Sequence, residues 1–363
     1  MSKPKSFLSI IKPSSFRTLL QASASSASPA SNAPADNAQE TANDRQTVPI
    51  DATWFMPNSP RNALEEYQNE RIPHARFFDL DKCSRDSPYP HMLPTQQIMA
   101  KTIEQLGKGH IKPSDNLVVY DKVGNFSSPR VAFTLKLFGY DRVYLLDNYL
   151  NYKNYDYPLD LNLIKTELIE SETNVENKQS QNQTKVHAQA ETQEQDIDDK
   201  HLPLTAEEFE ERYDREVIEY EELVNLIEED HIHEYLVLDA RSPDRFSGSA
   251  PEPRPGLSSG HIPTAKNLPF TKFLDQEQNN QYKSRDELES IVKEAVGVEQ
   301  LDEIATKYPK GIIVMCGTGV TACVLKLGLE NVLKLQNVNV RLYDGSWTEW
   351  AMRAPEELIV KDV

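Results

Sequence analysis

The two halves of the sequence carry the same motifs in the same order, and this repeat limits the fold more than any other feature. Each copy alternates short apolar runs with amphipathic stretches. That alternation predicts strands and helices in turn, and hence an α/β domain with a mainly parallel sheet flanked by helices. The copies lie roughly 190 residues apart, so we expect two such domains. The matching segments are 50–53 and 236–241, 71–76 and 261–267, 116–121 and 311–316, and 143–147 and 340–345.

One segment of the second copy, residues 311–329, has the pattern of a nucleophile site. An apolar run ends at Cys316, a Gly-rich loop follows through Gly317 and Gly319, and a packed helix is predicted from Val320. Backbone N–H groups and the helix dipole favour negative charge at such a helix start. We therefore expect Cys316 to be held partly as a thiolate, which is the nucleophilic form. The alternative is a buried core cysteine, the role that we assign to Cys323.

The first copy has no thiol at the corresponding position. Asp121 stands there, in the loop that follows the apolar run 117–120. If the reaction needs a thiolate, only the second domain can perform it. The first domain is then free to supply walls and accessory groups at the interface between the domains, where sites often form.

Composition excludes several classes of protein. The chain has 363 residues and a formal net charge of −18, which argues against binding nucleic acid or a membrane surface through a basic face. Three cysteines cannot form a disulfide framework in so long a chain, which favours a reducing compartment. No apolar run reaches the roughly 18 residues that a membrane-spanning helix needs.

Two stretches are predicted to be disordered. Residues 22–46 are rich in Ala, Ser, Asn and Pro, and residues 166–205 form an acidic linker with few large apolar side chains. The predicted domains are therefore 1–165 and 206–363. The first 35 residues contain basic but no acidic side chains, as in a mitochondrial presequence. The other interpretation is that 11–20 forms the first helix of the first domain, capped by Ser14 or Ser15.

Together these motifs resemble the rhodanese superfamily, and within it the tandem-domain thiosulfate and 3-mercaptopyruvate sulfurtransferases. The similarity is greatest to the fungal members that serve thiolation of the tRNA wobble uridine. It implies two rhodanese-like domains, of which the first is catalytically silent. The motifs are CGTGVTA at 316–322, GHIPTAKNLPF at 260–270, VRLYDGSWTEW at 340–350, SPYPHMLP at 87–94 and VVYDKVGNFSSPR at 118–130.

The resemblance implies a sulfur transfer that agrees with the interpretation of Cys316. Its thiolate would take the outer sulfur of thiosulfate or 3-mercaptopyruvate as a persulfide. The persulfide would pass that sulfur to a thiol, cyanide or a protein acceptor. No cofactor and no metal are implied. The loop amides would hold the terminal sulfur, and the residues concerned are Gly317, Gly319, Val320 and Thr321.

The resemblance also assigns groups around the thiol. Arg245 and Arg254 match positions that hold the substrate carboxylate, for which planar guanidinium groups are suited. His91 and Asp81 match a proton relay with the loop hydroxyl, here that of Thr318. The neutral loop favours mercaptopyruvate, whereas dedicated thiosulfate enzymes carry basic residues beside the nucleophile. Fungal relatives, however, are described as thiosulfate sulfurtransferases.

The implied partners are a small sulfur donor and the proteins of a sulfur relay, namely a cysteine desulfurase and a ubiquitin-like-protein activating enzyme with a rhodanese domain. Direct nucleic-acid or membrane binding is not expected, and the implied location is mitochondrion and cytoplasm. Two other classes of protein fit the sequence less well. A cysteine phosphatase needs an Arg six residues after the nucleophile, where this chain has Ala322. A non-catalytic rhodanese-type binding module usually lacks the cysteine that this chain keeps.

Overall fold

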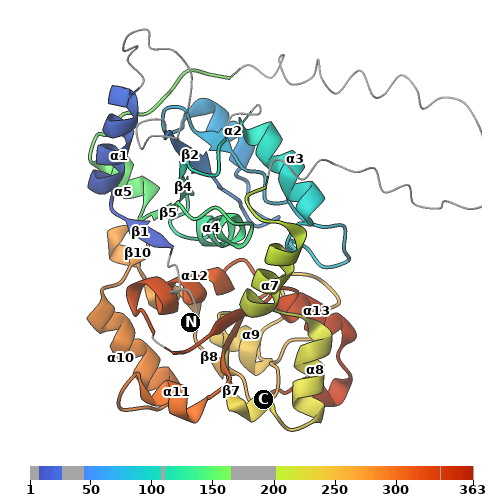
Figure 1. Ribbon diagram of the computed structural model, residues 1–363. Coiled ribbons are helices and arrows are strands. Elements are labelled where there is room, and N and C mark those ends of the chain that lie inside the picture. Colours follow the sequence, from blue (N-terminus) through green and yellow to red (C-terminus); the bar gives the residue numbers. More distant parts are fainter. Residues whose placement is uncertain (1–7, 27–44, 108–110, 165–201, 336, 363) are drawn as a thin grey trace, which may run out of the picture.

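The computed structural model shows two α/β domains, the first coloured blue to green and the second yellow to red (Figure 1). It describes residues 8–26, 45–107, 111–164, 202–335 and 337–362. Each domain is built on a five-stranded parallel sheet with helices around it. The fold class predicted from the repeat is confirmed.

The first sheet has the strand order β1-β5-β4-β2-β3, and every neighbouring pair is parallel. Its strands are β1 (Ser9–Ile11), β2 (Thr47–Asp51), β3 (Arg76–Phe77), β4 (Asn116–Tyr120) and β5 (Val143–Leu146). The central strand β4 is apolar and buried because helices cover both faces of a parallel sheet. The helices are α1 (Pro13–Ser26), α2 (Ala63–Asn69), α3 (Gln96–Gly107), α4 (Ser128–Leu137) and α5 (Tyr149–Asn154).

The second sheet repeats this order as β6-β12-β11-β7-β8, again with parallel pairs only. Its strands are β6 (Val217–Ile218), β7 (Tyr235–Asp239), β8 (Lys266–Asn267), β11 (Gly311–Met315) and β12 (Val340–Tyr343), beside an antiparallel hairpin of β9 (Leu274–Asp275) and β10 (Gln281–Tyr282). The helices are α7 (Ala206–Glu216), α8 (Tyr220–Glu228), α9 (Pro243–Ser247), α10 (Arg285–Val296), α11 (Glu303–Lys307), α12 (Ala322–Leu327) and α13 (Ser346–Arg353). Short helical turns are η5 (Ile232–Glu234), η6 (Phe270–Phe273), η7 (Gln276–Gln278), η8 (Gly328–Val332) and η9 (Glu356–Leu358).

The N-terminal segment is part of the first domain. Strand β1 pairs with β5, and Phe16 on α1 is fully buried. Of the two interpretations, the structure therefore shows the helix. That helix starts at Pro13, so the prediction of a cap at Ser14 or Ser15 was wrong, since Pro suits the first position of a helix. Helix α1 also includes residues 22–26 of the predicted disordered insertion.

Two predicted segments fall largely outside the described residues. These are the remainder of the insertion, apart from 45–46, and the linker, apart from 202–205. Their disorder and the domain boundaries that depend on it stay predictions. In the part of the chain that the structure describes, no helix is long and apolar enough to cross a membrane.

The two domains share one hydrophobic core. Helix α4 of the first domain packs against α12 of the second, and the largest buried apolar cluster contains residues of both. The hairpin of the second domain also reaches the first, where the backbone N–H of Tyr282 donates to Asp147 (3.0 Å). This packing brings the loops after β4 and β11 to the same interface.

Candidate active site

Cys316 directly follows β11, the central strand of the second sheet, and only 2% of its surface is exposed. The N-terminal residues of α13 hydrogen-bond to the backbone of Cys316. The Cys316 N–H donates to Ser346 Oγ (3.2 Å), and the Cys316 carbonyl accepts from the Trp347 N–H (3.0 Å). The Gly317 carbonyl accepts from the N–H (3.0 Å) and the hydroxyl (2.8 Å) of Thr348. These contacts fix the first two carbonyl groups of the loop toward α13.

The amides of the same loop are left without acceptors. Among the described residues, the N–H groups of 317–321 donate no hydrogen bond to protein. Gly319 shapes this turn, because its φ is +75° and a Cβ there would lie 2.7 Å from the Asp344 carbonyl oxygen. A run of buried N–H groups without partners is uncommon in proteins and indicates a place for an anion.

The first domain shows what such a loop holds. The Asp121 carboxylate is buried in it and accepts six hydrogen bonds of 2.6–3.1 Å. The donors are the N–H groups of Val123, Gly124, Phe126, Ser127 and Ser128 and the Ser128 hydroxyl. Gly124 lies three residues after Asp121, as Gly319 lies three after Cys316, and it also has a positive φ of +101°. The first loop thus carries a built-in anion where the second carries a thiol.

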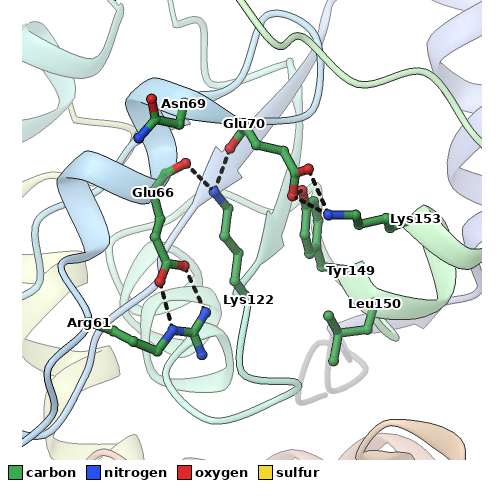
Figure 2. A pocket seen from close by; sticks show the side chains of 8 residues that line it. All are labelled: Arg61, Glu66, Asn69, Glu70, Lys122, Tyr149, Leu150 and Lys153. Carbon is green, nitrogen blue, oxygen red and sulfur yellow. Dashed lines mark hydrogen bonds and ion pairs between the residues drawn. The ribbon is translucent and has the colours of Figure 1, made fainter. Parts of the chain in front are cut away.

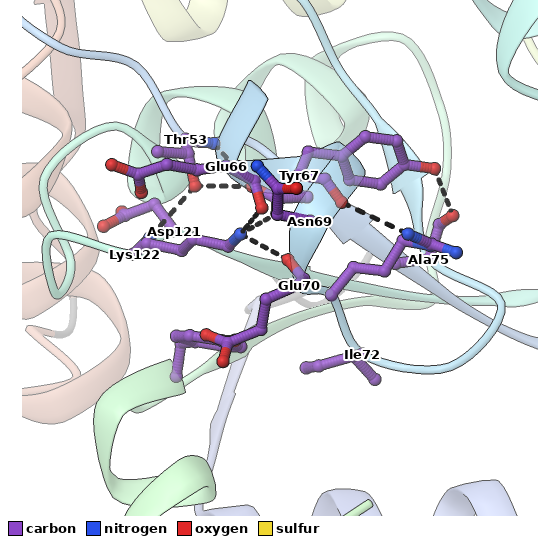
Figure 3. Close-up of polar contacts among 12 residues, drawn as sticks. Thr53, Glu66, Tyr67, Asn69, Glu70, Ile72, Ala75, Asp121 and Lys122 are labelled. Atoms are coloured by element: carbon purple, nitrogen blue, oxygen red, sulfur yellow. Dashed lines mark hydrogen bonds and ion pairs between the residues drawn. The ribbon is translucent and has the colours of Figure 1, made fainter. Parts of the chain in front are cut away.

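A cavity of about 340 Å³ lies at this end of the first sheet, and ion pairs fill its surroundings (Figure 2). Arg61 Nε pairs with Glu66 (2.6 Å), and Lys153 Nζ pairs with Glu70 (2.7 Å). Lys122 Nζ donates to the backbone carbonyls of Glu66 (2.6 Å) and Glu70, which lie at the C-terminal end of α2 (Figure 3). The basic groups of this cavity therefore already have acidic or carbonyl partners.

The predicted relay residues come together across the domain interface. His91 Nε2 lies 3.0 Å from Asp81 Oδ1, and His91 Nδ1 lies 3.1 Å from Thr318 Oγ1. The hydrogen bond with His91 holds the pKa of Asp81 below its ordinary value, and the Trp54 indole N–H also donates to this carboxylate. An ionised carboxylate only accepts, so His91 Nε2 carries a proton. In the neutral ring, Nδ1 then accepts from the Thr318 hydroxyl.

A buried ion pair that sequence reasoning missed holds this arrangement. Arg130 on α4 donates to Asp344, the residue after β12, at 2.6 Å, and to the His91 carbonyl at 2.7 Å. The other Asp344 oxygen accepts from the Leu93 N–H (2.7 Å). Both charged side chains are about 1% exposed or less. The sequence does show an acidic residue, Asp344, directly after the buried strand β12, but its partner Arg130 lies in the other domain.

The two predicted substrate arginines differ in their surroundings. Arg245 makes a two-point ion pair with Glu252, at 3.1 Å from Nε and 2.5 Å from Nη2. Its Nη2 lies 3.1 Å from the place of a Cβ on Gly317, and hence beside the loop. Arg254 is half-buried and has no hydrogen-bond or ion-pair partner among the described residues. Glu252 was also missed from the sequence.

The other two cysteines have different environments. Burial raises the pKa of Cys83 to about 11 and that of Cys323 to about 12. Cys323 is fully buried on α12, as the helix pattern predicted. Neither thiol lies in a loop of free amides, so both are poor nucleophiles at neutral pH.

Comparison with known proteins agrees with this geometry. The rhodanese-like domain family matches residues 36–151 and 219–353. The thiosulfate sulfurtransferase TUM1 of Saccharomyces cerevisiae is 36% identical over 320 residues, which are 87% of this chain and 91% of that protein. The mitochondrial thiosulfate/3-mercaptopyruvate sulfurtransferase 1 of Arabidopsis thaliana is 36% identical over 306 residues, 83% of this chain and 71% of that protein. The crystal structure of yeast Tum1 superposes with a TM-score of 0.72 at 31% identity, covering 98% of each chain.

These matches span both halves of the chain, including the loops that carry Asp121 and Cys316. The family and the fold expected from the motifs are thereby confirmed. The chain belongs to the rhodanese family, as one of its tandem-domain thiosulfate/3-mercaptopyruvate sulfurtransferases.

Proposed function

We propose that the enzyme moves sulfane sulfur from 3-mercaptopyruvate or thiosulfate, through a persulfide on Cys316, to a thiol, cyanide or an acceptor protein. The free amides of 317–321 carry this proposal. The two oxygens of Asp121 lie two bonds beyond its Cβ, as the terminal sulfur of a cysteine persulfide would. The amides of Gly124 and Phe126, which bind the Asp121 carboxylate, correspond in position to the free amides of Gly319 and Thr321, which are suited to a persulfide anion.

With mercaptopyruvate, the Cys316 thiolate attacks the thiol sulfur of the donor, and the S–S bond forms as the C–S bond breaks. The carbon that loses sulfur must gain a proton to leave as pyruvate. The donor thiol is the source of this proton. Thr318 can take it while its own hydroxyl proton moves to His91 Nδ1, and the reverse movement delivers a proton to the carbon, with Asp81 keeping His91 oriented. Arg254 and Arg245 are the groups suited to the donor carboxylate.

With thiosulfate, the same thiolate attacks the outer sulfur and sulfite leaves with the electrons of the broken S–S bond. Sulfite is a stable anion at neutral pH, so this step needs no proton from Thr318. The relay therefore distinguishes the two donors in the mechanism that we propose.

Steady-state assays of the purified full chain with each donor test this proposal, with cyanide as the acceptor. We expect thiocyanate from both donors, with pyruvate or sulfite as the second product. Mass spectrometry of the donor-treated enzyme should show one added sulfur atom on the peptide that contains Cys316. Cys316→Ser should lose both activity and added mass, whereas Cys83→Ala should keep them. A persulfide on Cys83 in the Cys316→Ser protein would overturn the assignment.

The more specific part of the proposal is a sulfur relay for tRNA thiolation. It comes from the resemblance of the motifs to the fungal members of the family. We propose that a cysteine desulfurase supplies the sulfur and that a ubiquitin-like-protein activating enzyme with a rhodanese domain receives it. Transfer of labelled sulfur from the Cys316 persulfide to such a rhodanese domain is the test, with the Cys316→Ser protein as control.

For location we propose mitochondrion and cytoplasm. A plant relative with 36% identity is named as mitochondrial, which supports the first. The net charge of −18 suits a protein that stays in solution rather than on an acidic membrane surface. Fractionation of cells that express the chain with a C-terminal tag tests both locations.

A further inference from the structure

Five charged side chains beside Cys316 form a network that is almost fully paired within the chain. We call it the mouth network, and it consists of Asp239, Arg241, Arg245, Glu252 and Arg254. Asp239 is fully buried, and the Glu252 side chain is 4% exposed. Water therefore screens these two carboxylates poorly, and their charges act strongly on their neighbours.

Four of the five N–H donors of Arg241 are bound within the chain. Its Nε and Nη2 bind the Asp239 carboxylate at 2.6–3.1 Å, and Nη2 also donates to the Gly260 carbonyl (2.6 Å). Its Nη1 donates to Glu252 (2.8 Å), while its guanidinium stacks on Trp347 at 4.1 Å. The hydrogen bond from Arg241 thus fixes the position of the Glu252 carboxylate.

Glu252 in turn compensates Arg245. One carboxylate oxygen is shared between Arg241 Nη1 and Arg245 Nε, and the other binds Arg245 Nη2. Arg245 Nη2 lies beside Gly317, but the positive charge of Arg245 is matched by a buried negative one. It is therefore a hydrogen-bond donor for the substrate rather than a free cation.

Arg254 is the uncompensated member of the network. Burial and the nearby charge of Arg245 lower the pKa of Arg254, and the Cys316 and Asp81 side chains are among its electrostatic neighbours. Asp81 makes its own hydrogen bonds with His91 and Trp54, and its side chain is 65% exposed, so water screens its charge. Three guanidinium groups against two buried carboxylates leave one positive charge for a ligand.

We propose that Glu252 is a specificity-determining, positioning residue, which matches the site to donors with a single negative charge. Such a donor is a thiol of a 2-oxo acid, in which one carboxylate meets the charge of Arg254. The dianion thiosulfate brings a second negative charge next to Glu252 with no free cation to balance it. This inference rests on the proposed function, because it concerns the choice between two donors of the same reaction.

The test is the ratio of kcat/KM for thiosulfate to kcat/KM for mercaptopyruvate, measured on one sample of each full-length variant. Glu252→Gln keeps the size of the side chain and one acceptor oxygen for Arg241 Nη1 and Arg245 Nε, whereas its NH₂ group faces Arg245 Nη2 and Arg245 loses its counter-charge. We expect the ratio to rise about tenfold, which corresponds to about 1.4 kcal/mol. In Arg245→Gln, Glu252 keeps Arg241 as its partner, while the mouth network loses one positive charge and mercaptopyruvate loses a hydrogen-bond donor, so this variant serves as a second background for Glu252→Gln. The double variant differs from Arg245→Gln only in the charge of residue 252, so its ratio should be about tenfold higher than that of Arg245→Gln.

Glu222→Gln is the matched control, because Glu222 makes a two-point pair with Arg341 at 2.5 and 2.6 Å on the surface, away from the mouth network. It changes the net charge by the same amount and should leave the ratio unchanged. Partial unfolding lowers both efficiencies together, so the ratio separates a charge effect from a structural one. If Glu252→Gln does not fold, the difference in the ratio between Arg245→Gln and the double variant decides between the two.

Equal changes for the two donors in Glu252→Gln and Arg245→Gln would overturn the inference and make these residues structural. A fall of the ratio when Glu252→Gln is introduced, in the wild-type or the Arg245→Gln background, would overturn it as well. If the wild-type enzyme turns over neither donor, the proposed function fails before Glu252 is tested.

Discussion

Replacing Asp121 by asparagine tests the comparison between the two loops. The exchange keeps the size of the side chain but removes its charge and one of its two acceptor oxygens. Asp121 Oδ1 accepts from two backbone N–H groups, and Oδ2 accepts from three N–H groups and a hydroxyl. The asparagine side chain is expected to place its oxygen at the former Oδ2 position, where it keeps the four hydrogen bonds made to that atom. The N–H groups of Val123 and Gly124 then face an NH₂ group.

The expected cost follows from these two groups. Each buried N–H that loses its acceptor costs about 1–3 kcal/mol, so the free energy of unfolding should fall by about 2–6 kcal/mol. Loss of the charge weakens the four remaining bonds and moves the result toward the upper end. Turnover per folded molecule should stay at the wild-type level, because this loop has no thiol.

The assay is urea-induced unfolding of the full chain, followed by circular dichroism, with activity measured on the folded fraction. Asp141→Asn is the control, since the Asp141 side chain is 69% exposed and surface exchanges change stability by about 0.5 kcal/mol or less. A cost below about 1 kcal/mol for Asp121→Asn would refute the reasoning. The amides of the first loop would then not need an anion, and the same argument for the Cys316 loop would lose its support.

Three further predictions concern the relay, the arginines and pH. Thr318→Val should lower kcat with mercaptopyruvate by about 10²–10⁴-fold and affect thiosulfate far less, because only the first donor needs a proton; equal losses in the two steady-state assays would contradict the relay. Arg254→Gln should reduce kcat/KM with mercaptopyruvate by about 10–100-fold, mainly through KM, because a charge-assisted bond is lost; an unchanged KM would exclude this contact. Burial raises the pKa of Asp147 to about 6 from 3.8, so the folded chain binds this proton more tightly than the unfolded chain. Its stabilising contribution is complete below pH 3.8 and is lost as pH rises through about 6. Asn can accept both hydrogen bonds made to Asp147 Oδ1. Between pH 4 and pH 7, Asp147→Asn should therefore gain roughly 2–3 kcal/mol in unfolding free energy relative to wild type, and a pH-independent difference in urea titrations would refute this.

The sequence determined the features that depend on neighbouring residues. Apolar runs of strand length and helical periodicity recur in both halves, and periodicity is a local property of the backbone. The repeat therefore predicted two parallel sheets, which the structure has in the same strand order. The position of Cys316 after the central strand and the absence of a thiol at Asp121 were also readable, because a loop is identified by the strand and helix beside it.

Where local patterns were ambiguous, the prediction was less accurate. Pro13 was expected before the first helix, with a serine as its cap, yet the helix begins at this residue. Residues 22–26 are rich in small residues and were assigned to disorder, but they extend α1. Composition does not report the neighbours against which a segment packs, and packing supplies most of the stability of a helix.

Only the tertiary structure decided how the site is assembled. The contact between His91 and Thr318 joins residues 227 positions apart, and the Arg130–Asp344 pair joins residues 214 positions apart. The pairing of Arg245 with Glu252 likewise decides which arginine beside the thiol remains uncompensated. The first two contacts depend on how two separately patterned domains pack against each other, whereas the pairing of Arg245 with Glu252 depends on the fold of the loop after α9. The local pattern of a sequence can mark one residue, as it does Asp344 after a buried strand, but it does not identify the partner that the tertiary structure brings to it.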